Sequence, residues 1–155
     1  MKAELVNPFI TATIKVLETM AFITVIPGKP YLKKEFTATG DVSSIVGLTG
    51  SPSGSFSLSF EKKIILKIVS NMFGEEITTF NEDVAEAAGE IANMVSGQAR
   101  QELEAGGFLF DGSIPSVVTG ENHELRHITE GPKIAVPFQE KETEGRFTLE
   151  ICFES

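Results

Sequence analysis

Apolar residues recur at three- and four-residue spacing in three segments of the chain, and this periodicity predicts three amphipathic helices. In the first segment, Asn7 is the expected N-cap and Pro8 the first helical residue. Gly74 follows the second segment and is a natural C-terminal stop. The predicted helices run from Asn7 to a point before Pro27, from about Glu61 to Phe73 and from about Asn81 to Glu104.

Shorter segments rich in Val, Ser, Thr, Ile and Phe, separated by Gly, Pro and charged residues, predict β-strands. Ser51 to Gly54 separates two of them and predicts a hairpin turn, and the polar segment 120–131 predicts a loop. The predicted strands are Ser43 to Thr49, Ser55 to Phe60, Ser113 to Thr119, Lys133 to Glu140 and Gly145 to Phe153. We therefore expect one α/β (α+β) domain over residues 1–155, with a mixed, mostly antiparallel sheet packed against three helices.

Composition narrows the classes of partner. The chain has 155 residues, is 41% hydrophobic and carries a formal charge of −9. This acidity argues against nucleic acid, whose phosphates bind clustered Lys and Arg, and favours a partner with exposed basic groups. The lone Cys152 excludes an intrachain disulfide and is expected to be a buried thiol.

No membrane span or signal peptide is expected. No stretch approaches the ~20 apolar residues of a span, and charged residues interrupt the apolar N-terminal segment. These features predict a cytoplasmic protein.

The longest predicted helix has one apolar and one polar side. On a wheel of about 100° per residue, the apolar stripe consists of Val84, Ala88, Ile91, Val95 and Ala99. The opposite side carries what we call the polar patch, consisting of Glu86, Glu90, Asn93 and Gly97. Polar residues on the solvent side of a helix are usually only solvated. However, glycine costs about 1 kcal/mol relative to Ala in an exposed helix interior, so its presence indicates a role outside helix stability.

The sequence around this patch resembles a known signature. Residues 90–97, Glu-Ile-Ala-Asn-Met-Val-Ser-Gly, are similar to the Glu-x-x-Asn motif of the CheC/CheX/FliY family of chemotaxis phosphatases, in which Asn-x-x-x-Gly often follows. Residues 7–10 with Thr19-Met20 resemble the opening helix of CheX, and residues 112–120 resemble the strand after its signature helix. These anchors span most of the chain in the order that the family shows.

The resemblance implies a phosphatase that acts on the aspartyl phosphate of a CheY-type response regulator. The regulator would supply Mg²⁺ and a Lys, so the chain would need no cofactor or metal of its own. Asn93 would orient the attacking water, and Glu90 would pair with the regulator's Lys. Glu86 and Gly97 would contact the partner, although the family often has Asp or Ser at the place of Glu86. The resemblance also implies a homodimer joined through sheet edges.

A trace of internal repetition indicates one such patch per chain. A shift of 74 residues aligns Thr19-Met20 with Asn93-Met94 and Val16 with Glu90. The first helix therefore lacks the acid and the amide.

Alternatives remain open. His123 and His127, with glutamates nearby, could hold a metal, but their glycine-bounded segment lacks helical periodicity. Residues 51–55 lack the Gly-Lys-Ser/Thr of a phosphate-binding loop, and no nucleophile motif is present. The main rival function is a non-catalytic CheX-like module that docks a regulator or a flagellar-switch component. A third hypothesis is a small-ligand sensor that uses the His123/His127 loop.

Overall fold

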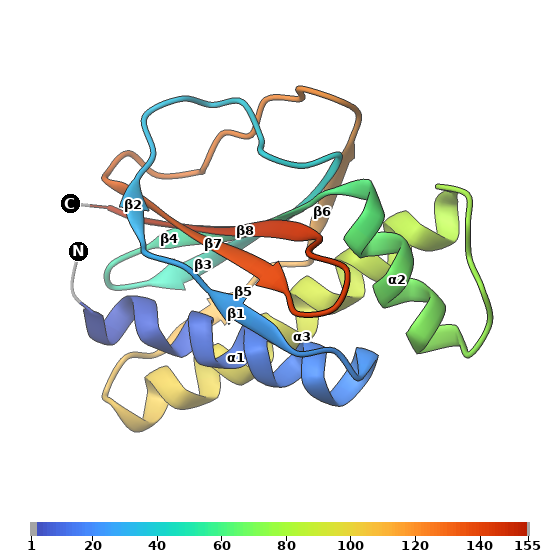
Figure 1. The fold of residues 1–155 in the computed structure, drawn as a ribbon. Helices are drawn as coiled ribbons and strands as arrows, with labels where there is room; N and C mark the ends of the chain where they lie inside the picture. The colour runs from blue at the N-terminus through green and yellow to red at the C-terminus, as the bar shows by residue number, and fades with distance from the viewer. Residues whose placement is uncertain (1–2, 155) are drawn as a thin grey trace.

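The computed structural model describes residues 3–154, in which a single α+β domain packs three helices against an eight-stranded sheet (Figure 1). The strand order is β1-β7-β8-β4-β3-β5, with β2 also pairing with β7 and β6 with β3. The helices are α1 (Ala3–Ala21), α2 (Lys62–Phe73) and α3 (Glu82–Ala105). The strands are β1 (Val25–Pro27), β2 (Tyr31–Leu32), β3 (Val42–Gly50), β4 (Gly54–Phe60), β5 (Phe110–Gly112), β6 (Ser116–Thr119), β7 (Lys133–Glu140) and β8 (Arg146–Phe153).

All strand pairs of the described residues are antiparallel, where the sequence led us to expect a mixed, mostly antiparallel sheet. The predicted hairpin is confirmed, because β3 and β4 pair from Val42 opposite Phe60 to Leu48 opposite Gly54. The segment 113–119 is only partly a strand. It follows a separate strand, β5, which pairs further along β3 and which the sequence did not predict.

Helix α1 begins at Ala3, so the prediction of Asn7 as its N-cap is wrong and Pro8 lies inside the helix. Inside the helix, proline removes the hydrogen bond that its missing N–H would give to the Glu4 carbonyl, and its ring crowds that carbonyl. Leu5 and Val6 are buried in the core, and their packing favours the additional turn.

The other two helices have the ends that the sequence predicts, within a residue. Glu61 is the N-cap position of α2, and Gly74 closes it in the left-handed conformation, with φ 70°. Asn81 caps α3 because its side chain accepts a hydrogen bond from the backbone N–H of Val84 at 3.1 Å. Glu82 and Asp83 lie in the first turn of α3, where the helix dipole favours negative charge.

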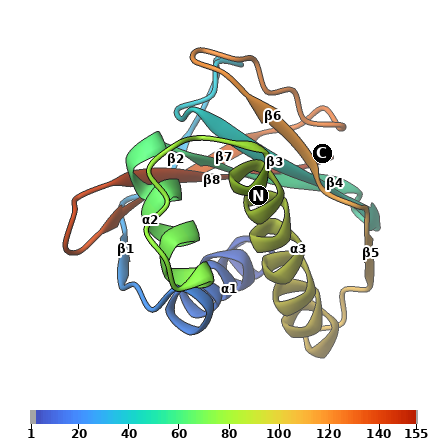
Figure 2. The same cartoon turned by 90° about the vertical axis from the view of Figure 1, so that its right-hand side faces the viewer.

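The two faces of the sheet are covered differently. Figures 1 and 2 show α1 and α3 side by side on one face, while the connections 33–41 and 120–132 pass over the other. Phe56, Leu58 and Phe60 of β4 point into the core under the helices. The intervening residues Ser55, Ser57 and Ser59 are also fully buried. The two connections enclose them and are joined by backbone hydrogen bonds from Ala38 to His123 and from Leu125 to Phe36.

Candidate functional site

Helix α3 has the two sides that the wheel predicts. The five residues of the predicted stripe have 0% exposure, which holds the helix firmly on the sheet and on α1. All four residues of the polar patch are exposed: Glu86, Glu90, Asn93 and Gly97. The four residues of the polar patch therefore lie together on the solvent side of α3.

Glu90 and Asn93 are not used for folding. Within residues 3–154, neither side chain makes a hydrogen bond or an ion pair with the rest of the chain. Their separation of three residues corresponds to a rise of about 4.5 Å along the helix, on neighbouring rows of its surface. An acceptor carboxylate and a carboxamide that can donate and accept thus face solvent together.

The neighbouring polar residue Ser96 has a different role. Ser96 is 1% exposed, and its Oγ accepts a hydrogen bond from Nε of Arg100 at 3.1 Å. Its Oγ also lies against Gly112 of β5, where a Cβ atom would come within 2.7 Å of it. Ser96 is therefore explained by packing, in contrast to Asn93 and Gly97.

A groove of about 370 Å³ runs beside the polar patch, between α1 and α3. Gly97 and Met94 line it from α3, and Lys15, Thr19 and Met20 line it from α1. Sequence reasoning did not find the α1 side of this groove, because it depends on how two helices far apart in the chain pack together. Methionines on both sides give it an adaptable apolar lining.

Val16 also bears on the number of patches per chain. It is the α1 residue that aligns with Glu90 in the 74-residue shift, and it is 3% exposed. A carboxylate at that position would be buried, so α1 could not present a second copy of the acid in this packing.

The histidine loop is engaged in internal hydrogen bonds. His123 bonds to Oγ of Ser43 at 2.7 Å and to the carbonyl of Gly120 at 2.6 Å. His127 bonds to Oγ of Ser55 at 2.7 Å and to Glu150 at 3.3 Å. The part of the chain described here contains no group of three His, Cys, Asp or Glu side chains placed to hold a metal ion.

Glu150 is the centre of a buried charged cluster under that loop. Its Oε2 accepts a hydrogen bond from Nζ of Lys33 at 2.6 Å, and both side chains are almost without exposed surface. Burial raises the pKa of Glu150, but the hydrogen bonds from His127 and Lys33 outweigh burial and hold this pKa below its usual range. The cluster is a structural connection between the loop and β8.

The family model described as "Chemotaxis phosphatase CheX" matches residues 42–139, well over half of the chain, including all of α3. The chain belongs to the CheX family. "CheY-P phosphatase CheX" of Thermotoga maritima is 30% identical over 127 residues, which are 81% of this chain and 82% of that protein. The chain is thus a homologue of a CheY-P phosphatase, and the predicted family is confirmed.

Solved CheX structures share the whole fold. The chemotaxis protein CheX of Desulfovibrio desulfuricans is 46% identical, with a TM-score of 0.89 over 97% of this chain and 99% of that one. The CheX of the CheX–CheY–BeF3–Mg²⁺ complex from Borrelia burgdorferi is 28% identical, with a TM-score of 0.80 over 97% of each chain.

The helices of residues 3–154 include none long and apolar enough to cross a membrane.

Proposed function

We propose that the polar patch promotes hydrolysis of the aspartyl phosphate of a CheY-type response regulator, with Asn93 positioning the attacking water. One observation carries the proposal: Glu90 and Asn93 are exposed, uncommitted within residues 3–154, and one turn apart on a helix whose other side is buried. The CheY-P phosphatase among the relatives and the CheX–CheY complex support this substrate.

Asparagine suits the proposed role because its side chain is neutral and both donates and accepts hydrogen bonds. Phosphoryl transfer is assisted mainly by alignment and electrostatics, so an amide that holds one water in line with the phosphorus accelerates it. Removal of one such positioned hydrogen bond typically lowers the rate by about 10²–10³.

Glu90 is proposed to pair with the Lys of the regulator's phosphorylation site. The ion pair would lose water when the two proteins dock, so it would contribute mainly to recognition. Glu86 and Gly97 would extend this contact on either side, with Gly97 allowing the regulator's backbone to approach the helix closely.

The proposal requires no metal or cofactor on this chain. The Mg²⁺ would belong to the regulator, as the composition of the Borrelia burgdorferi complex suggests. Because response regulators are phosphorylated inside the cell, the proposed substrate also implies a cytoplasmic location.

We also propose that the chain forms a homodimer through sheet edges. Among residues 3–154, strand β6 pairs only with β3, and β2 only with β7, so both leave an edge that a second copy could extend. Light scattering of the purified protein at micromolar concentration tests this, and a mass of one chain would contradict it.

The decisive experiment follows the decay of a CheY-type regulator labelled by radioactive acetyl phosphate, with and without this chain. We expect wild type to accelerate phosphate loss and Asn93→Ala to reduce the acceleration by at least about 10². Asn93→Asp is expected to fail equally, because a carboxylate is repelled by phosphoryl oxygens. Unfolding free energies of both variants should stay within about 0.5 kcal/mol of wild type.

Asn7→Ala is the matched control, since it removes another exposed helical amide. Asn7 lies about 18 Å along α1 from Thr19, which lines the groove beside the patch. Unchanged hydrolysis by Asn93→Ala would refute the catalytic proposal. Binding of the regulator by wild type without faster phosphate loss would instead favour the non-catalytic docking module.

A further inference from the structure

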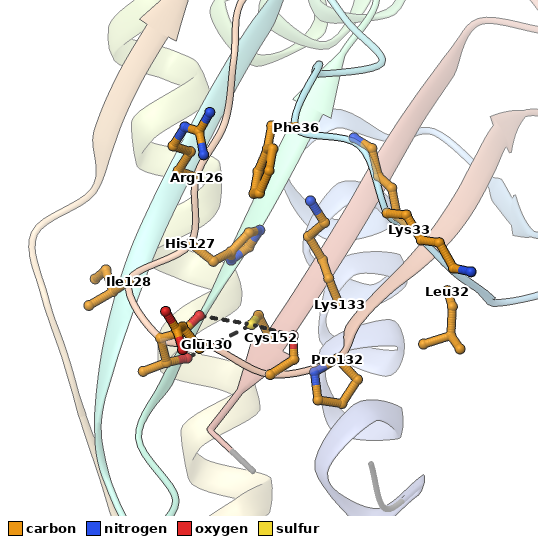
Figure 3. A pocket seen from close by; sticks show the side chains of 13 residues that line it. Leu32, Lys33, Phe36, Arg126, His127, Ile128, Glu130, Pro132, Lys133 and Cys152 are labelled. Carbon is orange, nitrogen blue, oxygen red and sulfur yellow. Dashed lines mark hydrogen bonds between the residues drawn. The ribbon is translucent and has the colours of Figure 1, made fainter.

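A second cavity lies on the sheet face opposite α1 and α3, under the two covering connections (Figure 3). Its volume is about 710 Å³, and residues from 32–36, 126–133 and Cys152 line it. This size falls within the range of about 300–1,000 Å³ that small-molecule sites occupy. The proposed phosphatase function makes no use of it.

The two ends of this cavity differ in chemistry. Figure 3 shows Arg126, His127 and Lys133 gathered around Phe36 at one end. Ile128 and Pro132 lie toward the other end, with Glu130. The site therefore combines a cationic end with an apolar one, although the chain as a whole carries a charge of −9.

Lys133 is the unusual group at the cationic end. It is 8% exposed, and its Nζ donates a hydrogen bond to the carbonyl of Glu35 at 2.6 Å. Nζ also lies 4.7 Å from the centroid of the Phe36 ring. Within residues 3–154, no carboxylate forms an ion pair with it. Buried ammonium groups are normally paired with an anion, as Lys33 is with Glu150.

Arg126 adds a second positive charge beside the same ring. Its guanidinium carbon lies 4.0 Å from the centroid of Phe36. Its ion pair with Glu124 is long, at 3.4 Å, and exposed on both sides, so it neutralises the charge weakly. Two cations thus flank one ring at the edge of a cavity, and an anion placed there would be attracted by both.

We propose that this cavity binds a small organic anion with an apolar body. Its anionic group would lie near Lys133 and Arg126, and its body would contact Ile128, Pro132 and Leu32. The acidic Glu130 toward the far end would fix the orientation by repelling the anionic group. Because the site lies across the sheet from the polar patch, the inference does not depend on the proposed phosphatase function.

The probe for this site is 8-anilinonaphthalene-1-sulfonate, a fluorescent anion with an apolar aromatic body. We expect saturable binding of one probe per chain. Arg126→Gln and Lys133→Gln should each weaken binding by about tenfold, the usual consequence of losing one charge-assisted contact. If Lys133→Gln does not fold, as judged by circular dichroism, Arg126→Gln on the exposed rim decides the result.

Lys63→Gln is the matched control, because it removes one positive charge from an exposed position of α2. It should bind the probe like wild type, and so should Asn93→Ala, which separates this test from that of the phosphatase. Absence of saturable binding, or equal weakening by Lys63→Gln, would overturn the proposal. So would unchanged binding in both cavity variants.

Competition tests the two parts of the proposed ligand. Octanoate should displace the probe, since it has both an anionic group and an apolar body. Acetate and 1-octanol at the same concentration should not. Equal displacement by acetate would show that the apolar end is not used, and equal displacement by 1-octanol would show the same for the cations. Either result would contradict the assignment.

Discussion

Gly89 and Gly97 lie eight residues apart on α3 and have opposite surroundings. A Cβ atom on Gly89 would lie 3.2 Å from Cγ2 of Val117 on β6, whereas one on Gly97 would have nothing within 4 Å. An added Cβ at Gly89 would therefore press on the neighbouring strand, and Val117 would have to shift by a few tenths of an ångström to admit it. Gly97 weakens the helix with no packing advantage among the described residues, and this is the behaviour expected of a surface that a partner covers.

The glycine pair gives a first prediction. Gly97→Ala should raise the free energy of unfolding by up to about 1 kcal/mol, because alanine favours the helix and meets no neighbour. Gly89→Ala should raise the free energy of unfolding by less, because the Val117 side chain must move. Urea denaturation measures both. Gly97→Ala should also weaken binding of the regulator in a titration, and unaltered affinity would remove Gly97 from the proposed interface.

Glu90→Ala should distinguish a role of Glu90 in binding the regulator from a role in the dephosphorylation step. Truncation leaves the regulator's Lys unpaired at the interface, which costs about 2 kcal/mol or about thirtyfold in affinity. We expect KM to rise with kcat nearly unchanged in regulator dephosphorylation. Glu104→Ala, about 21 Å further along the same helix, is the control. A fall in kcat at unchanged KM would assign Glu90 to the chemical step instead.

Glu140 should make stability depend on pH. Burial raises its pKa, but hydrogen bonds from Glu142, Thr143 and Lys67 outweigh burial and lower this pKa from 4.5 to about 2. The folded state therefore gains stability above pH 4.5, and this gain is lost as the pH falls from 4.5 toward 2.

Comparison with Glu140→Gln measures this contribution. At pH 7 the variant should be less stable by about 2 kcal/mol, and the difference should shrink in urea unfolding at pH 3. Glu142→Gln, an exposed carboxyl in the same turn, should change stability by less than about 0.5 kcal/mol. A difference between wild type and Glu140→Gln that stays constant with pH would contradict the assignment.

The buried pair of Lys33 and Glu150 should be sensitive to loss of one partner. Glu150→Gln leaves the Lys33 ammonium buried without a counter-charge, and we expect destabilisation of about 3–5 kcal/mol. The double variant Lys33→Met with Glu150→Gln should recover part of that loss. Thermal denaturation of the three proteins gives the comparison. A double variant less stable than Glu150→Gln would contradict this explanation, because removal of the unpaired ammonium would then not relieve the loss.

Much of the site could be predicted because it lies on one helix. A single helix fixes the relative directions of Val84 and Asn93 by local geometry, so a wheel was enough to separate the buried stripe from the polar patch. The N-cap Asn81 and the stop at Gly74 are also local signals, and the structure confirms both.

What the sequence could not predict depends on distant contacts. The start of α1 at Ala3 is favoured by burial of Leu5 and Val6, which overrides the position of Pro8. The strands β1 and β2 are too short to show a pattern and form only because β7 lies beside them. Likewise, Ser55 looks like a solvent-facing residue until the connection with His127 covers it.

The firm packing of α3 has a consequence for how the two proteins meet. A helix with five unexposed side chains along one side cannot bend or unwind without exposing its core, so the backbone positions of Glu90 and Asn93 keep a constant separation. In the proposed complex, any change of backbone on association would then have to occur in the regulator. The chain would then discriminate among regulators by whether their phosphorylated site is open enough to accommodate helix α3 without a change in its backbone.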